Sequence, residues 1–531
     1  MSKAADIGKV SATGSFHLLW GLVVSTVISS VATIFVARLL GSDLYGLYTI
    51  VLVAPTLIGV FRDWGVNSAM VRYAAQSRGE ERTSEVRSIF VSGLIFEIAM
   101  GLALSALSFA LSGFLAVDVF HRPTIASLIE LASISILATG LVNAATAAFT
   151  GVERMEHYSI MVVIQSIFKT IIMITLVLEG LGTPRALTGA ITGYTAAYAI
   201  AAATGILLMY TIYRKLPKPD TRKLEIKAYI KTMLTYGTPL SIATIISGFQ
   251  TQFFTFLLPI FYVSSNVAIG NFGIASTYVV LITFFATPIT TMLFPAFSKL
   301  NPEKDKDALK SVFQFSIKYA SLLVLPLAAL VMCLAQPAVA TLFGSSYSSA
   351  PLFLALLAIT YIYTAFGSLT TGNFILSQGK TRFYLYLTLI TAAIAFPVGY
   401  LLIMQFGVLG LIITSLTVSI PSLIISLFWI YKHYGLTVDW KSSAKILVSS
   451  LTAAALTYAL VIMLPFSSWI RLIIGLVFFT IVFAAATLLT RTINKADIEN
   501  LRAMTSGLGP VGKTVNRILN LLEKIMTALK L

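Results

Sequence analysis

Long apolar segments of about twenty residues follow one another along this chain, with short polar stretches between them. A segment of this length crosses a hydrocarbon core of about 30 Å as an α-helix, because a helix satisfies its backbone hydrogen bonds internally. The pattern therefore predicts an all-α polytopic membrane protein with about fourteen transmembrane helices. The expected ranges are 17–37, 44–70, 88–113, 124–147, 158–178, 187–212, 232–258, 267–293, 312–334, 351–375, 383–404, 407–430, 443–464 and 468–490.

Lysine and arginine are unevenly distributed among the connections. With the N-terminus inside, 30 of the 37 basic residues lie in cytoplasmic loops and termini. Four fall outside or at the outer rim (Arg38, Arg122, Arg185, Arg471) and three lie within spans (Arg62, Lys169, Lys318). Cytoplasmic loops of membrane proteins carry such an excess of positive charge. We therefore expect a multi-pass protein of the cell (plasma or inner) membrane with both termini in the cytoplasm.

The composition agrees with this interpretation. Of the 531 residues, 57% are hydrophobic and 11% are charged, whereas about a quarter of a typical soluble chain is charged. The net charge of +16 is explained by basic loops that face anionic lipid, so it does not indicate nucleic acid. The single cysteine, Cys333, lies in an apolar segment, which excludes a disulfide framework and a thiolate metal site.

A short pattern occurs twice, 227 positions apart: Tyr-Gly-Leu at 45–47 resembles Phe-Gly-Ile at 272–274, and further matches follow at the same offset. Both copies lie in spans that run from outside to inside, which indicates parallel repeats of the kind found in transporters. We expect an N-lobe (1–213, helices 1–6), a basic cytoplasmic linker (214–231), a C-lobe (232–430, helices 7–12), helices 13 and 14 (431–490) and a cytoplasmic amphipathic tail (491–531).

The tail contains a match to a nucleotide-binding motif. Residues 507–514, Gly-Leu-Gly-Pro-Val-Gly-Lys-Thr, fit the P-loop pattern. The pattern binds nucleotide only where a strand precedes the loop and a helix follows it on a parallel sheet. Only 17 residues follow Thr514, so no such sheet can form. We interpret the segment as a glycine-proline hinge before a helix at the membrane surface, and we expect no cofactor.

Catalytic groupings are absent from the sequence. None of the four histidines lies near a serine–acid pair or a metal-ligand set with useful spacing. A membrane glycosyltransferase or glycan polymerase would need a sizeable charged outer loop to hold a sugar phosphate, and the predicted outer loops are short. We therefore expect a transporter rather than an enzyme, without a metal site.

Charged residues inside the spans are the most informative, because each costs roughly 2.5–3.5 kcal/mol at the bilayer centre if it faces lipid. Under one interpretation they neutralise each other between packed helices, in pairs such as Arg62–Glu97 or Asp63–Lys169. Under the other they line a hydrophilic central cavity, where cationic groups bind an anionic head group. Lys318, about one third into the ninth span, belongs to the same set of cations.

Carboxylates are confined to the first half of the predicted bundle, since spans seven to fourteen contain no Asp or Glu. A cation that drives transport through a carboxylate would therefore use Asp63, Glu97 or Glu130. The seventh span contributes Gln250 and Gln252. Glutamine amides there suit sugar hydroxyls, although they equally join helices.

Four short segments of the first two spans resemble a known family: Ala-Arg-Leu-Leu-Gly at 37–41, Tyr-Gly-Leu-Tyr at 45–48, Asp-Trp-Gly at 63–65 and Ala-Met-Val-Arg-Tyr at 69–73. They are similar to the opening of polysaccharide transporters, the O-antigen-type flippases of the multidrug/oligosaccharidyl-lipid/polysaccharide (MOP) exporter superfamily. The sequence departs from the glycine-leucine that often follows the acidic residue in that family, since Trp64 and Gly65 follow Asp63.

The resemblance implies a two-lobed fold with an alternating central cavity. It also implies a cargo, a polyprenyl- or dolichyl-(pyro)phosphate-linked oligosaccharide that is turned from the inner to the outer leaflet. Cavities in the family are typically cationic, which favours Arg38 and Arg62 as cargo-binding residues, with Lys169 and Lys318 as weaker additions.

A cation-coupled multidrug exporter of the same superfamily is the main alternative function. Such exporters usually have twelve spans and an acidic cavity, so helices 13 and 14 and the basic residues count against it. The expected partners are the lipid-linked oligosaccharide, membrane lipids, H⁺ or Na⁺ as coupling ion, and glycan-assembly enzymes. We expect no nucleic acid, and function as a monomer.

Overall fold

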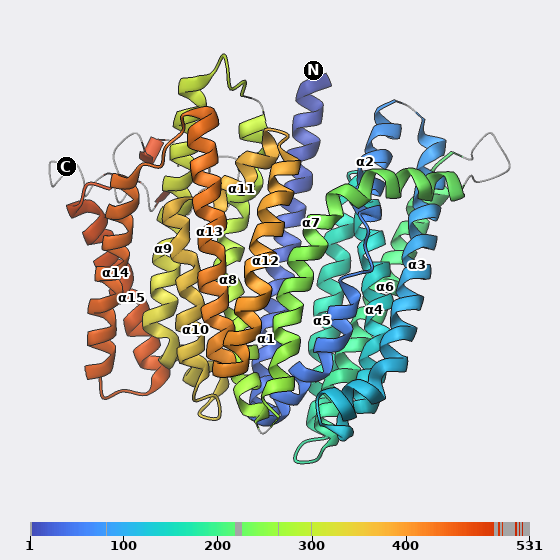
Figure 1. Cartoon of the computed structure of the whole chain (residues 1–531), viewed down its shortest axis with the longest axis horizontal. Helices are drawn as coiled ribbons and strands as arrows, with labels where there is room; N and C mark the ends of the chain where they lie inside the picture. The colour runs from blue at the N-terminus through green and yellow to red at the C-terminus, as the bar shows by residue number, and fades with distance from the viewer. Residues whose placement is uncertain are drawn as a thin grey trace. The chain divides into compact units, whose positions relative to one another are not determined.

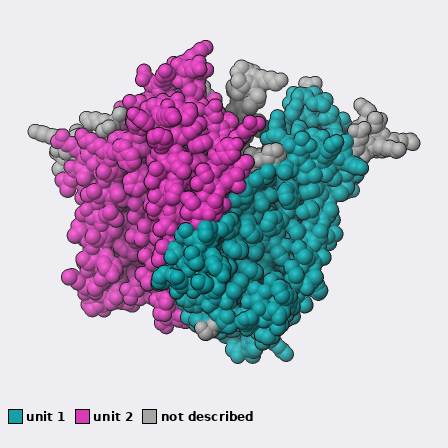
Figure 2. Space-filling model, viewed as in Figure 1, with its two compact units in different colours: residues 1–273, 396–411 teal, residues 274–395, 412–531 magenta. Residues whose placement is uncertain are grey.

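The computed structural model describes residues 3–80, 82–217, 226–263, 265–298, 300–492 and 497–499, and the single residues Arg502, Asn516, Arg517, Asn520 and Glu523. The regular structure of these residues is helical throughout (Figure 1). The chain divides into two compact units (Figure 2). Unit 1 comprises residues 1–273 and 396–411, and unit 2 comprises residues 274–395 and 412–531. The predicted lobes, separated at 214–231, stay a prediction.

Unit 1 contains the first seven α-helices and the beginning of the eighth. They are α1 (Lys3–Gly59), α2 (Val66–Gly79), α3 (Thr83–Phe114), the π-helix η1 (Leu115–Val119), the 3₁₀-helix η2 (Pro123–Ile125), α4 (Ala126–Gly151), α5 (Met155–Glu179), α6 (Arg185–Lys215), α7 (Ile226–Phe261) and α8 (Asn266–Ser298). Helices α3, α4, α5 and α6 run side by side (Figure 1).

Unit 2 contains the remainder of α8 and most of the later helices. They are α9 (Lys306–Phe343), α10 (Ala350–Ala358), the 3₁₀-helix η3 (Ile359–Phe366), α11 (Ser368–Ser377), α12 (Thr381–Phe406), α13 (Val408–Tyr434), α14 (Trp440–Met463) and α15 (Ser468–Leu489). Residues 396–411, from the end of α12 and the start of α13, belong to unit 1. Helices α14 and α15 pack against α9 through Cys333, Ala453 and Phe479.

The helices agree with a multi-pass membrane protein. Among the described residues, eleven helices are long and apolar enough to cross a membrane, or twelve if the bent pair formed by residues 350–366 and 368–377 is one span. Helix α1 has 57 residues, about 86 Å at the α-helical rise, so it is too long for one crossing. Its backbone leaves the helical region at Gly41 (φ 69°), between the first two predicted spans. The prediction of fourteen spans is compatible with this arrangement.

The second predicted span, 44–70, is wrong in its inner part. Helix α1 ends at Gly59, and α2 begins only at Val66. The chain turns between them, and Gly65 takes a left-handed conformation (φ 81°) next to the backbone of Gly237 in α7. A side chain at this position would collide with that backbone, so the sharp turn and the close approach both require glycine.

The core of unit 1 is built from small residues. Helix α4 contributes Ala144, Ala145, Ala147 and Ala148, and they pack with Val66, Met70, Phe90 and Phe149. Small side chains let helix backbones approach closely. The two glycines of the sequence repeat lie at the crossing of α1 and α8. A Cβ on Gly273 would lie 2.8 Å from Thr49 Oγ1, and one on Gly46 would collide with the backbone of Asn266.

Candidate functional site

The break between α1 and α2 places two of the predicted site residues in a turn inside unit 1. Arg62 and Asp63 lie between Gly59 and Val66, and not within a continuous helix as the sequence pattern indicated. Arg62 is buried at 7% exposure, and Asp63 is half-buried. The turn directs Arg62 toward the carboxylate of Glu97 in α3.

Arg62 and Glu97 form a buried ion pair. The Nε of Arg62 donates to Glu97 Oε2 at 3.0 Å, and Asn67 Nδ2 donates to Oε1 at 2.6 Å. Both carboxylate oxygens are thus engaged, and Glu97 is fully buried. Of the two pairs considered from the sequence, Arg62–Glu97 forms. Asp63–Lys169 is not among the ion pairs of the described residues.

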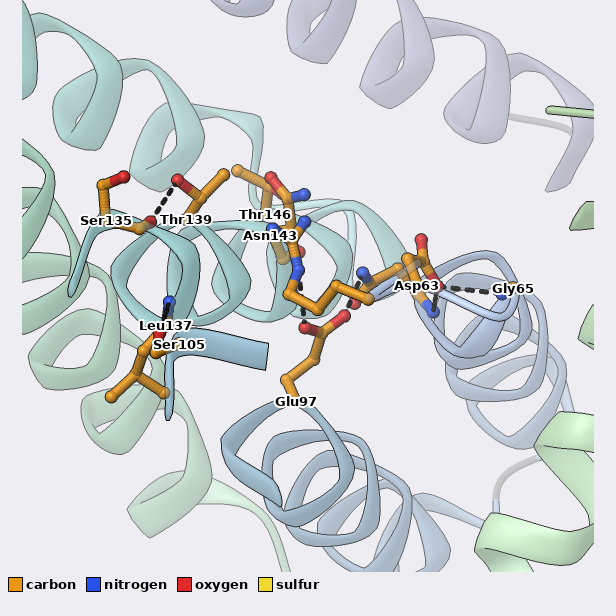
Figure 3. Close-up of polar contacts among 11 residues, drawn as sticks. Asp63, Gly65, Glu97, Ser105, Ser135, Leu137, Thr139, Asn143 and Thr146 are labelled. Atoms are coloured by element: carbon orange, nitrogen blue, oxygen red, sulfur yellow. Dashed lines mark hydrogen bonds and ion pairs between the residues drawn. The ribbon is translucent and has the colours of Figure 1, made fainter. Parts of the chain in front are cut away.

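Helix α4 provides the space for this pair. A Cβ on Gly140 would lie 2.8 Å from Glu97 Oε2 and 2.9 Å from Arg62 Cδ, which is closer than ordinary van der Waals contact. Figure 3 shows Glu97 reaching from α3 toward the side of α4 that carries Asn143 and Thr146. Both of these residues are half-buried. The ion pair therefore lies against a polar side of α4.

The guanidinium of Arg62 retains capacity for another ligand. Only its Nε forms a hydrogen bond within the part of the chain that the structure describes, and no described residue accepts from Nη1 or Nη2. Those two nitrogens carry four of the five N–H groups of an arginine. A buried guanidinium with its forked end unoccupied can take an anion through two parallel hydrogen bonds.

Asp63 has a structural contact at the start of α2. Its Oδ1 accepts from the backbone N–H of Gly65 at 2.9 Å and from that of Asn67 at 3.4 Å. Such contacts satisfy backbone N–H groups that the first turn of a helix leaves free. Glu130 is half-buried in α4 and accepts from Ser112 Oγ at 3.3 Å. A role of either carboxylate in ion coupling stays a prediction.

Lys169 lies beside a group of tyrosines that sequence reasoning missed. Its Nζ is 6.0 Å from the ring centroid of Tyr194. Tyr194 contacts Tyr198 at 4.9 Å and Tyr48 at 6.5 Å between ring centroids, and Tyr48 contacts Tyr45 at 5.5 Å. The spacings of three in α1 and four in α6 put each pair on one helix face, a signal that was present in the sequence.

The remaining candidates of unit 1 form no hydrogen bond or ion pair with Arg62 or Glu97 among the described residues. Arg38 is exposed, and no described residue forms an ion pair with it. Gln250 and Gln252 of α7 are half-buried. The Oε1 of Gln252 accepts from Thr56 Oγ1 at 3.4 Å, so this glutamine joins α1 to α7.

Lys318 forms a different buried ion pair, in unit 2. Its Nζ lies 2.6 Å from Asp497 Oδ2, and Tyr319 donates its hydroxyl to Oδ1 at 3.3 Å. Asp497 follows α15 at the start of the predicted tail and is buried. The tail was expected to lie at the membrane surface, so this partner was not anticipated. The P-loop match at 507–514 lies outside the described residues.

Arg122 is the second buried arginine of unit 1, and sequence reasoning assigned it only to the outer rim. It joins the segment between η1 and η2 to the end of α7 and the start of α8. Its Nε donates to Asn266 Oδ1 at 2.8 Å. Its other two nitrogens donate to the backbone carbonyls of Phe120 (2.7 Å), Pro259 (3.0 Å), Tyr262 (2.7 Å) and Val263 (3.2 Å).

An acidic residue completes this second cluster. Asp43 Oδ1 accepts from Asn266 Nδ2 at 3.1 Å. Burial lowers the pKa of Arg122 from its usual value, and the negative charge of Asp43 opposes this effect. The described residues include no group of three His, Cys, Asp or Glu side chains that could hold a metal ion.

Comparison with known proteins gives distant relatives. The chain is 20% identical to the probable low-salt glycan biosynthesis flippase of Haloferax volcanii over 271 residues, which cover 51% of this chain and 57% of that relative. The chain thus spans less than two thirds of that protein. An uncharacterized membrane protein of Methanocaldococcus jannaschii is 20% identical over 415 residues, 76% of this chain and 80% of the relative.

Solved structures show the fold. The lipid II flippase MurJ, in an inward closed conformation, matches with a TM-score of 0.70 at 16% identity, over 89% of this chain and 98% of that one. An inward-facing multidrug resistance transporter of the MATE family, in the MOP superfamily, matches with a TM-score of 0.62 at 17% identity, over 77% and 94% of the two chains. The fold is that of the MOP superfamily, as the sequence resemblance implied.

A protein-family model that matches more than half of the chain shows the family. Residues 35–352, more than half of the chain, match the model of a family described as polysaccharide biosynthesis protein. This range includes Arg62 and Arg122 of unit 1 and Lys318 of α9, whereas Asp497, the partner of Lys318, lies beyond it. The chain is a multi-pass membrane protein that belongs to the family described as polysaccharide biosynthesis protein.

Proposed function

We propose that the protein is a flippase for a polyprenyl- or dolichyl-(pyro)phosphate-linked oligosaccharide, which it turns from the inner to the outer leaflet by alternating access. The product would serve the assembly of a cell-surface glycan or glycoprotein. The observation that carries the proposal is the buried guanidinium of Arg62, whose two terminal nitrogens have no acceptor among the described residues.

The lipid phosphate is the part of such a cargo that is hardest to move, because a bare anion in hydrocarbon loses its hydration. An arginine offsets this loss through forked, charge-assisted hydrogen bonds to phosphate oxygens. Glu97 holds Arg62 by its Nε. The forked end is therefore oriented without being occupied, which is the arrangement that a phosphate site needs.

Glu97 is the best candidate for coupling to an ion gradient. Protonation of its carboxyl would remove the negative partner of Arg62 and strengthen the attraction of the guanidinium for an anionic cargo. A proton would thus favour loading, and loss of the proton would favour release. Asp63 and Glu130 remain alternatives, although Asp63 is engaged by the backbone of α2.

The tyrosine group near Lys169 suits the sugar part of the cargo. Tyrosine offers both an apolar ring face and a hydroxyl, and Tyr45, Tyr48, Tyr194 and Tyr198 form a connected set. Fewer contacts support a cargo-binding role for the remaining candidates, which are Arg38, Gln250, Gln252 and Lys318. Lys318 in particular already has a carboxylate partner.

A transport assay in reconstituted vesicles tests the proposal. The probe is a polyprenyl-pyrophosphate-linked disaccharide with a fluorescent label on the sugar, placed in one leaflet. Vesicles with the protein should expose the label to a membrane-impermeant quencher in the opposite compartment, and empty vesicles should not. The probe is placed first in one leaflet and then in the other, with either a proton or a sodium gradient. If the wild-type protein moves it under none of these conditions, the proposal is contradicted.

A cation-coupled multidrug exporter is the second candidate, because the fold is shared with a MATE family transporter. The same vesicles distinguish the two functions when they are loaded with ethidium in place of the lipid probe. Ethidium efflux that depends on a cation gradient, without movement of the lipid probe, would favour the exporter. We expect the reverse result.

A further inference from the structure

Two arginines and two tyrosines form a continuous stack where α3 begins and α6 ends. The guanidinium carbon of Arg87, in the first turns of α3, lies 4.1 Å from the ring centroid of Tyr213 in α6. The rings of Tyr213 and Tyr210 are stacked, with 6.5 Å between centroids and 18° between planes. Arg214 lies 5.9 Å from the ring centroid of Tyr210. These four residues make up the Arg–Tyr ladder.

The two ladder arginines lack the carboxylate partners that neighbouring arginines have. Arg82 pairs with Glu80 and Glu85. By contrast, Arg87 and Arg214 form no ion pair within the described part of the chain. The Nε of Arg87 is buried and has no hydrogen-bond acceptor among the described residues. Because Nε is closed off by the packing, a ligand from outside would bind Arg87 through its two terminal nitrogens.

The exposed face of α6 indicates the depth at which the Arg–Tyr ladder would lie in a membrane. Leu207, Tyr210 and Arg214 follow at helical spacing on one face, and all three are exposed; Leu207 is 65% and Tyr210 is 54% exposed. An exposed face that passes from leucine to tyrosine to arginine matches the boundary between hydrocarbon and head groups of a membrane. The ladder therefore lies where the phosphates of a bilayer leaflet are found.

We propose that the Arg–Tyr ladder binds the phosphate of an anionic bilayer lipid. The tyrosine rings hold both guanidinium groups flat by cation–π contact, which leaves the N–H groups at their edges free for phosphate oxygens. The charge-based orientation places this end of α3 and α6 on the cytoplasmic side. There, anionic lipid is attracted to basic residues near the surface. This site is separate from the proposed transport site at Arg62.

Native mass spectrometry of the full-length, delipidated protein tests the proposal. The probe is dioleoyl phosphatidylglycerol, titrated into the detergent solution, with dioleoyl phosphatidylcholine as the zwitterionic reference. Arg87→Ala and Arg214→Ala should each weaken the affinity for phosphatidylglycerol roughly fivefold, as expected for one basic residue near anionic lipid. Arg82→Ala is the matched control, because its side chain is exposed at the same end and already paired; it should bind as the wild type does. Tyr213→Phe keeps the ring and should also bind normally.

Three results would overturn the proposal. The first is unchanged phosphatidylglycerol binding in the Arg87→Ala, Arg214→Ala double variant. The second is equal affinity for phosphatidylcholine. The third is displacement of phosphatidylglycerol by an equimolar amount of dolichyl phosphate or by millimolar inorganic phosphate, since the ladder would then prefer the cargo or a free anion to bilayer lipid. Thermal unfolding of each variant ensures that a loss of binding is not a loss of folded protein.

Discussion

Among the described residues of unit 1 two arginines are buried, and they differ in how completely their donors are used. Arg122 donates from all three nitrogens to an amide oxygen and four backbone carbonyls. Arg62 donates from Nε alone, to the carboxylate of Glu97, and its forked end has no acceptor among the described residues. Burial by itself therefore does not distinguish a structural arginine from a binding one. We propose that the occupancy of the terminal nitrogens does, with Arg122 as the structural arginine and Arg62 as the binding one.

The partners differ in a second way. The acceptors around Arg122 are neutral and cannot be removed by a proton, so this contact holds α7 and α8 under any condition in which the protein is folded. The partner of Arg62 is a carboxylate, and protonation would change the charge of the pair. One arginine suits a permanent connection and the other suits a site whose affinity changes during transport.

The largest effect on stability is expected for Arg122→Ala. The substitution leaves four carbonyls and the Asn266 amide without their donor, and each unsatisfied buried group costs about 1–3 kcal/mol. We expect the free energy of unfolding to fall by at least about 3 kcal/mol, measured by thermal unfolding in detergent. Arg185→Ala is the control, since Arg185 is an exposed arginine at the start of α6. Equal melting temperatures for the two variants would show that Arg122 is not the structural arginine described above.

A smaller loss of stability is expected for Glu97→Gln. Removal of the charge leaves Arg62 without its partner, which in a dry interior costs about 3–5 kcal/mol. We expect about 2 kcal/mol, because a site open to a phosphate is also open to water. Glu156→Gln, at a partly exposed pair with Arg154, should change stability by less than about 1 kcal/mol. If Glu97→Gln destabilises the protein as much as Arg122→Ala does, the pair is dry and structural.

The smallest effect is expected for Gly140→Ala. The added methyl group would lie 2.8 Å from Glu97 Oε2 and must displace the ion pair, at a cost of about 1 kcal/mol. The displacement should lower transport more than stability. Gly113→Ala in α3 is the control, because nothing lies within 4 Å of its added Cβ. Normal transport by Gly140→Ala would mean that the position of the pair is unimportant for cargo.

The sequence alone predicted most of the helices, and it predicted the Arg62–Glu97 pair as one of two possible pairs. Hydropathy indicated most of the helices, because each must be apolar over its whole length. It did not predict the turn inside 44–70, where Gly65 approaches the backbone of Gly237 in another helix, or the 53° bend between residues 350–366 and 368–377 inside the expected span 351–375. Arg62–Glu97 was anticipated as one of two pairs, since both residues are charged and lie at similar depth.

Arg122 could not be found in this way. Its acceptors are mainly backbone carbonyls, which every residue has, and three of them are 137 to 141 positions away. The partner of Lys318 was missed for a related reason, because Asp497 lies 179 positions away in a polar tail. The tyrosine group near Lys169 was detectable from its helical spacing, but tyrosines in an apolar helix usually serve as core.

The most direct test of the account compares transport and stability in Arg62→Ala, Glu97→Gln and the double variant. Movement of the lipid-linked probe is measured in vesicles without an ion gradient, so that a coupling role of Glu97 does not affect the result, and melting temperatures are measured beside it. We predict that Glu97→Gln still moves the probe, that Arg62→Ala is at least about tenfold slower, and that the double variant regains stability but not transport. Recovery of both stability and transport in the double variant would contradict the account, because Arg62 would then serve only to neutralise Glu97.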